Sequence, residues 1–202
     1  MSEARIDTPQ VHTHTQAEAT HIDNMKFAMW LFLASEVVLF AVMIAGYVLF
    51  RVNFPERVKE VHEAAGILLV TLNTFLLLSS SWTMVMGLRA IQGNDQRGLI
   101  RWIGLTALLG TIFVILQGVE YTALSHEGIT IYSDNFGMRF YAPTALHGAH
   151  VIIGVLWALW VLWRGSKGTY NSGKFLGVEI FGLYWHFVDV VWIFLFTLIY
   201  LI

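Results

Sequence analysis

The sequence predicts an all-α membrane protein built as a bundle of five transmembrane helices. Only 13% of its 202 residues are charged, whereas an ordinary soluble domain carries about a quarter. Five apolar runs exceed the roughly 18 residues that mark a membrane-spanning helix. Because these runs are continuous rather than alternating, they favour helices over the strands of a membrane barrel.

The expected spans divide the chain into a short polar segment and one membrane domain. Residues 1–24 form a polar N-terminal tail without the apolar core of a cleavable signal peptide, so we expect a mobile tail on one membrane surface. Residues 25–202 form the transmembrane domain, with connections of about 11 to 16 residues that leave no room for a soluble domain. The spans are expected at residues 27–50, 64–88, 102–124, 140–163 and 175–202, each long enough to cross a hydrocarbon core of about 30 Å.

The composition excludes some classes of function, and the positions of Lys and Arg predict the orientation of the chain in the membrane. The net charge is −2 and no basic patch suggests nucleic-acid binding, while the absence of cysteine excludes thiolate metal sites and disulfides. Eight of the twelve Lys and Arg residues lie on the side of the membrane that receives the tail and the second and fourth loops. Because cytoplasmic loops carry the excess of positive charge, we expect a cytoplasmic N-terminus and a C-terminus outside.

Ionisable side chains within the spans are the candidate functional residues. Each costs about 2.5 to 3.5 kcal/mol at the bilayer centre, so each should face protein or water with a partner. The set is Glu36, Glu120, His147, His150, Glu179, His186 and Asp189, with Trp192 one turn beyond Asp189. Glu36 lies near mid-membrane with no basic residue in its own span, so we expect a protonated carboxyl group. Its role is either proton handling or one structural hydrogen bond to a neighbouring helix, and the hydrogen bond already accounts for its burial.

The histidines and carboxylates allow two interpretations. His147 and His150 share one helical face, and Glu179, His186 and Asp189 follow one stripe of the last span. Such residues could bind a metal, yet helical di-iron sites place Glu-x-x-His on two helices, and no span contains that motif. We therefore favour a buried hydrogen-bond network, and we expect no metal ligand, no pair of axial haem ligands and no catalytic residue on this chain.

Five motifs, in chain order, resemble those of one known family. They are residues 30–40 with Glu36, 72–80, 117–121, 147–154 and 184–200. Together they span the chain from about Met25 to its end and resemble subunit III of haem–copper terminal oxidases, the cytochrome c oxidase subunit 3 family. The chain resembles the short five-helix bacterial form, because two N-terminal helices of the longer form have no counterpart here. Residues 142–146 depart from the family pattern.

The resemblance implies a supporting role in an oxygen-reducing, proton-translocating enzyme of the aerobic respiratory chain. In this family haem and copper lie in the partner subunits I and II, so the chain is expected to hold no redox cofactor and to bind beside subunit I. It is expected to hold phospholipid and to sustain proton uptake and catalytic lifetime. Glu36 matches the family's buried carboxyl group, which reacts with hydrophobic carbodiimides. The resemblance also implies the bacterial cytoplasmic membrane, with cytochrome c as electron donor to the complex.

Other interpretations stay open. Within the same superfamily, the chain also resembles subunit III of quinol oxidases and the related small subunit of nitric oxide reductases. A different class is an independent transporter or metal permease that uses Glu36, Glu120, His147 and His186. That class predicts metal binding or transport by the isolated chain, and the oxidase-subunit interpretation predicts neither.

Overall fold

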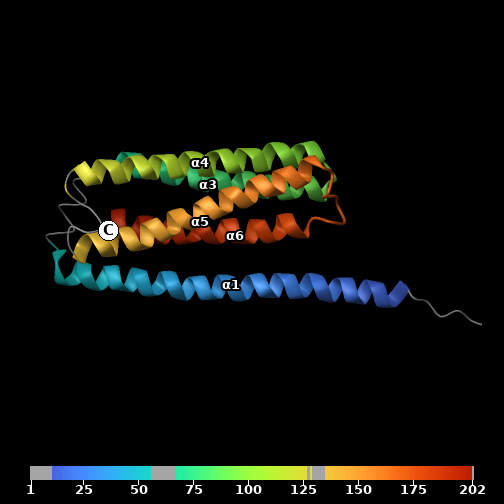
Figure 1. Cartoon of the computed structure of the whole chain (residues 1–202), viewed down its shortest axis with the longest axis horizontal. Helices are drawn as coiled ribbons and strands as arrows, with labels where there is room; N and C mark the ends of the chain where they lie inside the picture. The colour runs from blue at the N-terminus through green and yellow to red at the C-terminus, as the bar shows by residue number, and fades with distance from the viewer. Residues whose placement is uncertain (1–10, 56–66, 127, 129–134, 202) are drawn as a thin grey trace, which may run out of the picture.

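The computed structural model consists of long helices that run side by side (Figure 1). It describes residues 11–55, 67–126, 128 and 135–201. The helices are α1 (Val11–Asn53), α3 (Ile67–Gln92), α4 (Gln96–His126), α5 (Asn135–Ser166) and α6 (Leu176–Leu195), which continues as the π-helical segment η1 (Phe196–Leu201). Within the described residues, five helices are long and apolar enough to cross a membrane, which confirms the predicted fold class.

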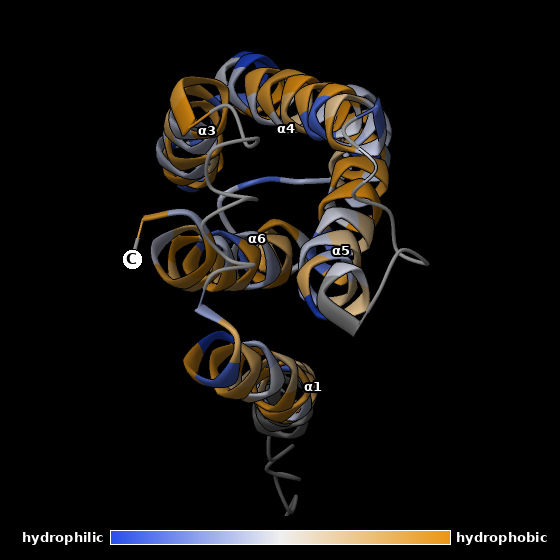
Figure 2. Cartoon of the chain, turned by 90° about the vertical axis from the view of Figure 1, so that its left-hand side faces the viewer, coloured by the Kyte–Doolittle hydropathy of each residue, from blue (hydrophilic) through white to orange (hydrophobic). Residues whose placement is uncertain are grey.

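Four of the helices form a bundle, and α1 lies against its outer side. α3 packs on α4, α4 on α5 and α5 on α6, while α6 closes the group against α3. α1 contacts α5 and α6, as the end-on view in Figure 2 shows. The bundle therefore has a closed interior between α3 and α6, and a separate seam between α1 and the α5–α6 pair.

The helices differ in how far the protein encloses them. In the most apolar window of each span, 17% of the residues are buried in α1, against 50% in α6. Trp185, Trp192 and Phe181 of α6 are fully buried. α6 therefore forms the centre of the bundle, whereas α1 presents most of its apolar side chains outward.

The connection between α3 and α4 is much shorter than the sequence suggested. α3 continues to Gln92 and α4 begins at Gln96, so residues 93–95 alone join them, and the expected length of 11 to 16 residues is wrong at this point. Asn94 adopts a left-handed conformation with φ 59°, which reverses the chain direction. Asp95 then caps α4, since its Oδ1 accepts the Gly98 N–H at 2.9 Å. The polar residues before and after this turn are helical, because α3 and α4 both extend beyond their apolar stretches.

The first helix also begins earlier than the first expected span. α1 includes residues 11–24 of the predicted polar tail, and its candidate membrane span begins at Ile22. These residues extend an existing helix and therefore need no new nucleus, which is the costly step of helix formation. The first turns of α1 project beyond the end of α3–α6 (Figure 1). Residues 1–10 of the predicted tail lie outside the described residues.

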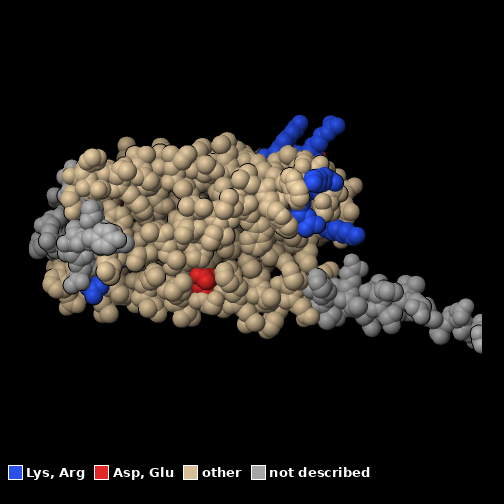
Figure 3. Space-filling view, viewed as in Figure 1, with Lys and Arg blue, Asp and Glu red and all other residues tan. Residues whose placement is uncertain are grey.

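The α3–α4 and α5–α6 turns lie together at one end of the molecule. The Ser172 N–H donates to Asn94 Oδ1 at 3.4 Å, and Gln96 Nε2 donates to the Gly165 carbonyl. The N-terminal part of α1 reaches the same end, where Lys26 Nζ lies 2.7 Å from Glu179 Oε1. Lys and Arg side chains gather over this end in Figure 3. Among the described residues, this end therefore carries most of the Lys and Arg side chains.

Candidate functional site

The carboxyl group of Glu36 meets an imidazole at the seam between α1 and α5. Glu36 Oε2 lies 3.2 Å from His150 Nε2, and the two side chains are 15% and 11% exposed. The two atoms are within ion-pair distance, but they lack the alignment of a hydrogen bond. The first span contains no basic partner for Glu36. That partner is His150 of α5, more than a hundred residues further along the chain.

The other ring nitrogen of His150 contacts the backbone of its own helix. Nδ1 lies 2.8 Å from the Leu146 carbonyl oxygen. A carbonyl oxygen only accepts, so Nδ1 donates in this contact, and Nε2 is the ring nitrogen that faces Glu36.

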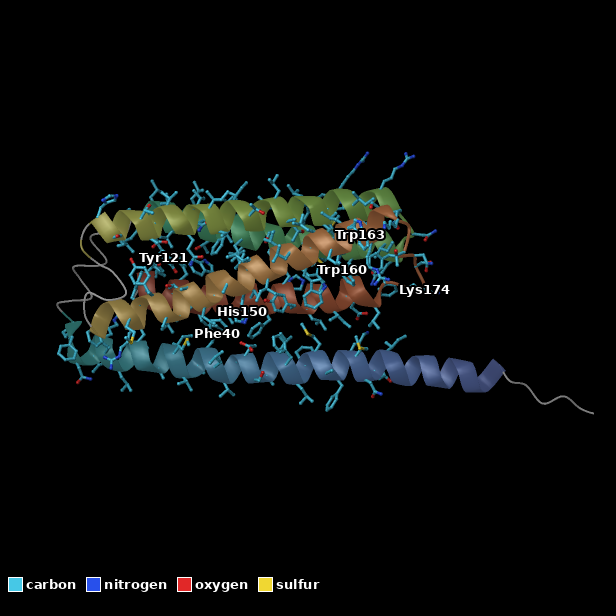
Figure 4. The ribbon with its side chains drawn as sticks, viewed as in Figure 1. Phe40, Tyr121, His150, Trp160, Trp163 and Lys174 are labelled. Carbon is cyan, nitrogen blue, oxygen red and sulfur yellow. The ribbon has the colours of Figure 1, made fainter. Side chains whose placement is uncertain are left out.

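Aromatic rings enclose this pair. Phe40 of α1 faces His150 edge-on with ring centroids 5.3 Å apart, and both residues are labelled in Figure 4. Tyr184 of α6 lies along the other side of the imidazole at 6.4 Å and donates its hydroxyl to the His150 carbonyl at 2.9 Å. His150 is therefore held by contacts from both α1 and α6.

His147 lies one turn before His150 but faces the interior of the bundle. Its ring stacks on Trp192 of α6 with centroids 4.8 Å apart and meets the edge of Phe113 of α4 at 5.7 Å. It is 0% exposed, and neither ring nitrogen has a hydrogen-bond partner among the described residues. Both histidines thus contact α6, but His150 also meets α1, whereas His147 also meets α4.

The stripe on α6 separates into an interior part and an end part. Ser81 Oγ lies 2.5 Å from His186 Nδ1 and also lies beside the Asp189 carboxyl group. Neither Asp189 oxygen has a well-formed hydrogen bond in the described part of the chain. Trp192 Nε1 donates to Thr74 Oγ1 at 2.9 Å. Residues 186–192 therefore attach α6 to α3.

Glu179 is separate from that interior group. It occupies the first turn of α6, where its side chain is 29% exposed and pairs with Lys26. The carboxylate therefore helps to fix α1 against α6 near the membrane boundary. The sequence analysis grouped Glu179 with the buried polar residues, because the expected fifth span begins at residue 175, before Glu179.

Glu120 of α4 belongs to a third buried group near the opposite end. It is 4% exposed and lies beside the Tyr200 hydroxyl of η1. One turn earlier, Gln117 Nε2 donates to the Thr144 carbonyl and to the Tyr121 hydroxyl, both at 3.1 Å. These contacts join α4 to α5 and to the C-terminal π-helical turn.

The candidate residues do not converge on one centre. Among the described residues, no three His, Asp or Glu side chains form a group that could hold a metal ion. They occupy the α1 seam, the α3–α6 contact, the α4–η1 contact and the end of the molecule. Sequence reasoning named none of the partners Ser81, Tyr184 and Lys26, although Ser81 belongs to a serine run in an otherwise uncharged span. The contacts of these groups each join one helix to another.

Comparisons with known proteins show the family of the chain. A family model described as cytochrome c oxidase subunit III matches residues 9–202. The chain is 41% identical over 195 residues to cytochrome c oxidase subunit 3 of a Synechocystis species, covering 94% of this chain and 82% of that protein. It is 37% identical to the protein of that name from Bacillus subtilis, covering 88% and 86% of the two chains. It is also 33% identical to quinol oxidase subunit 3 of Bacillus spizizenii, covering 92% and 90%. A match of this length, on a fold of five membrane-spanning helices, means that the chain belongs to the cytochrome c oxidase subunit III family.

Proposed function

We propose that this chain is the non-redox subunit III of a proton-pumping haem–copper oxidase in a bacterial cytoplasmic membrane, with cytochrome c as electron donor. The redox centres lie in subunits I and II, and this chain binds beside subunit I. It holds lipid there and sustains proton uptake and catalytic lifetime. The dispersed polar contacts support this division of labour, since each one attaches a helix.

The open face of α1 is the observation that carries the proposal. α1 is far less enclosed than the helices of the bundle, and Val38, Val42 and Leu49 along it are largely exposed. Membrane helices bind one another by close packing and hydrogen bonds rather than by hydrophobic burial. A long face without such contacts suits the helices of a larger partner, and we assign it to subunit I.

A groove beside this face supports the lipid-holding role. Two adjoining cavities of about 450 and 460 Å³ lie between α1 and α6. They share Val37, Phe187 and Val190, and His186 is their one residue with an ionisable side chain. An almost wholly apolar groove of this size suits the acyl chain of a phospholipid between this chain and its partner.

The Glu36–His150 pair acts in this proposal as a positioning contact. It joins α1 to α5 in the middle of the membrane, where a lone charge is costly. By keeping α1 in place, the pair preserves the surface that subunit I meets. In this proposal the pair affects proton uptake only through its effect on subunit I, and Glu36 has a structural role.

The charge distribution supports a cytoplasmic N-terminus. The α3–α4 and α5–α6 turns meet at one end of the molecule, where Lys and Arg side chains gather in Figure 3. Lys26 lies at the same end, because it pairs with Glu179 in the first turn of α6. Loops of this kind stay on the cytoplasmic side. A single cysteine introduced at Lys174, in a chain with no native cysteine, should react with a membrane-impermeant maleimide only after the cells are opened.

Affinity purification of the full chain in mild detergent tests the proposal. We expect two larger subunits to co-elute with haem bands and copper. Copper in a subunit II centre would identify cytochrome c as donor, and a copper-free subunit II would identify quinol. A colourless, partner-free chain that binds metal stoichiometrically would instead support the permease class.

Cysteine cross-linking tests the assigned face directly. Val42→Cys on α1 and Leu156→Cys on α5 place single thiols at lipid-level positions that are 67% and 61% exposed. A short bifunctional reagent should join Val42→Cys to subunit I, whereas Leu156→Cys should give no such product. Equal cross-linking from both positions would contradict the assignment of α1.

A further inference from the structure

Three buried polar side chains in the interior of α3–α6 have atoms without a hydrogen-bond partner. Asn73 of α3, His147 of α5 and Asp189 of α6 are 1%, 0% and 3% exposed. In the described part of the chain, Asn73 Oδ1, both ring nitrogens of His147 and both carboxyl oxygens of Asp189 lack a well-formed hydrogen bond. Unpaired polar atoms are rare at such depth in folded proteins. These atoms therefore indicate a partner that the described side chains do not supply.

The three side chains lie close together, because each of them adjoins Trp192. The His147 ring stacks on the Trp192 indole with centroids 4.8 Å apart. Asn73 precedes Thr74, whose hydroxyl accepts the indole N–H at 2.9 Å. Asp189 lies three residues before Trp192, on the same face of α6. Asn73, His147 and Asp189 therefore form one cluster, the Trp192 group, which includes residues from three helices.

Two members of the Trp192 group are held in place by other contacts. Asn73 Nδ2 donates to the Phe113 carbonyl at 3.3 Å, so Oδ1 is the amide atom that is left for another partner. The His147 imidazole lies between the face of Trp192 and the edge of Phe113, whose centroid is 5.7 Å away. These contacts restrict the rotation of both side chains toward other protein atoms.

The unpaired atoms need a partner that both donates and accepts. Asn73 Oδ1 only accepts, whereas a neutral imidazole presents one donor and one acceptor. The Asp189 carboxyl group accepts in either protonation state. A water molecule donates two hydrogen bonds and accepts others, so it satisfies all three side chains. Buried water typically makes about three hydrogen bonds to protein groups that are otherwise unpaired.

We propose that the interior of α3–α6 binds water molecules at the Trp192 group. The waters join Asn73 Oδ1 on α3 to His147 on α5 and to Asp189 on α6. They act as cross-links between helices within a membrane, where lipid offers no hydrogen bond to replace them. The site lies inside the bundle and is separate from the α1–α6 groove. It depends on the fold of the chain and not on its proposed role in the oxidase.

Radiolytic footprinting of the full chain in mild detergent tests for these waters. Intense X-rays convert bound water to hydroxyl radicals, which oxidise the side chains next to it. Phe113 and Phe181 are a matched pair, because both are 0% exposed and bulk water reaches neither ring. Phe113 adjoins the Trp192 group, whereas Phe181 packs on Trp157 and Trp185. We expect oxidation of Phe113 to be several-fold faster than that of Phe181, and equal rates would overturn the proposal.

Substitutions connect this labelling to the Trp192 group. His147→Phe and Asn73→Leu each remove unpaired polar atoms, so each should lower oxidation of Phe113 several-fold. The control Thr106→Val also removes a fully buried polar group, but its hydroxyl already pairs with Thr83 Oγ1 at 2.8 Å. It should leave the labelling unchanged, and an equal loss in this control would contradict a water site at the Trp192 group. The comparison of Phe113 with Phe181 in the wild-type chain needs no variant, so the test survives a variant that fails to assemble.

Thermal unfolding gives a second readout, in which a hydrated and a dry interior predict opposite signs. With bound water, His147→Phe loses water-mediated hydrogen bonds, so Tm should fall. In a dry interior the same change replaces an unpaired imidazole with a ring that needs no partner, so Tm should rise. A rise in Tm would overturn the proposal. So would a metal ion that is present in the wild-type protein and lost from His147→Phe with its subunits still assembled, since it would make the group a cation site.

Discussion

The helices α3–α6 pack on one another through contacts of a different kind from those that hold α1 against α5 and α6. In the interior, Trp185 donates to Ser80 Oγ at 3.0 Å and Trp192 donates to Thr74 Oγ1 at 2.9 Å. In the seam, Glu36 and Phe40 of α1 meet His150 of α5, and Phe50 meets Arg139. A groove separates much of α1 from α6. Apart from single water molecules, side chains of α3–α6 fill the interior, whereas the groove in the seam has room for a larger molecule.

Small residues explain the closeness of the interior. A methyl group at Gly154 would lie 2.5 Å from Trp185 Cζ3, and one at Gly110 would lie 2.6 Å from Trp185 Cη2. The indole thus fills the space that two glycines leave on α4 and α5. Because lipid tails are as apolar as leucine, this close fit and the indole hydrogen bond supply the attraction between these helices. α1 is attached instead by polar contacts such as Lys26–Glu179 and Tyr47 with the Ile199 carbonyl.

The largest expected effect comes from removing the central indole. Trp185→Ala leaves a cavity between α3, α4 and α5 and removes the donor to Ser80, so unfolding should become easier by about 3 to 5 kcal/mol. Reversible unfolding in mixed detergent micelles measures this change. Trp82→Ala on the exposed side of α3 is the control and should cost less than about 1 kcal/mol. Equal losses would mean that the interior is no tighter than the surface.

Overfilling the same contact should have the next largest effect. Gly154→Ala places its methyl group against the Trp185 ring and should destabilise the bundle by about 1 to 3 kcal/mol. Gly104→Ala is a matched control, because nothing lies within 4 Å of the added carbon. The difference between the two alanine variants, in the same unfolding assay, isolates the close approach from helix propensity.

In the seam, replacing the carboxyl group of Glu36 should change its chemical reactivity more than the stability of the protein. Glu36→Gln keeps a polar side chain beside His150 and should alter unfolding by less than about 1 kcal/mol. It should abolish labelling by a hydrophobic carbodiimide, which requires a carboxyl group. Glu120→Gln is the control and should leave labelling of Glu36 intact.

The purified complex then distinguishes the two roles of Glu36. We expect turnover and proton pumping to survive Glu36→Gln. Collapse of both activities in a fully assembled complex would falsify the structural role and make Glu36 a proton-handling group.

The smallest effect is expected at the membrane boundary. Lys26→Met and Glu179→Gln each break the Lys26–Glu179 ion pair, whose side chains are about one third exposed. Such pairs contribute about 0 to 1 kcal/mol, because water screens them. A double-mutant cycle of the two variants gives the coupling energy. A coupling well above 1 kcal/mol would show that α1 is anchored at its end rather than at Glu36.

The sequence was sufficient for the five spans, because length and apolar character alone decide whether a helix can cross a bilayer. It did not reveal the three-residue α3–α4 connection, since polar residues such as Arg89 and Arg101 ended the expected spans although the helices continue through them. The motif of residues 184–200 indicated the family, and the comparisons confirm it.

The partners of the site residues were beyond the sequence for a geometric reason. Periodicity shows which residues share a face of one helix, but the rotation of that helix against its neighbours decides what the face meets. His147 and His150 differ by one turn, and this is enough to direct one at Trp192 and the other at Glu36. Lys26, Ser81 and Tyr184 became partners through that rotation, and no pattern within their own segments distinguished them.

The long sequence separation across the α1 seam has a consequence for how the protein is made. Lys26 and Glu179 are 153 residues apart, and Tyr47 donates to the Ile199 carbonyl across 152 residues. At about 5 to 20 residues per second of synthesis, α1 enters the membrane many seconds before α5 and α6 exist. During that interval Glu36 has no His150 to meet. Because α1 is made before the helices on which it packs, the seam forms late, and an assembly factor, a lipid or a partner subunit has time to act on it.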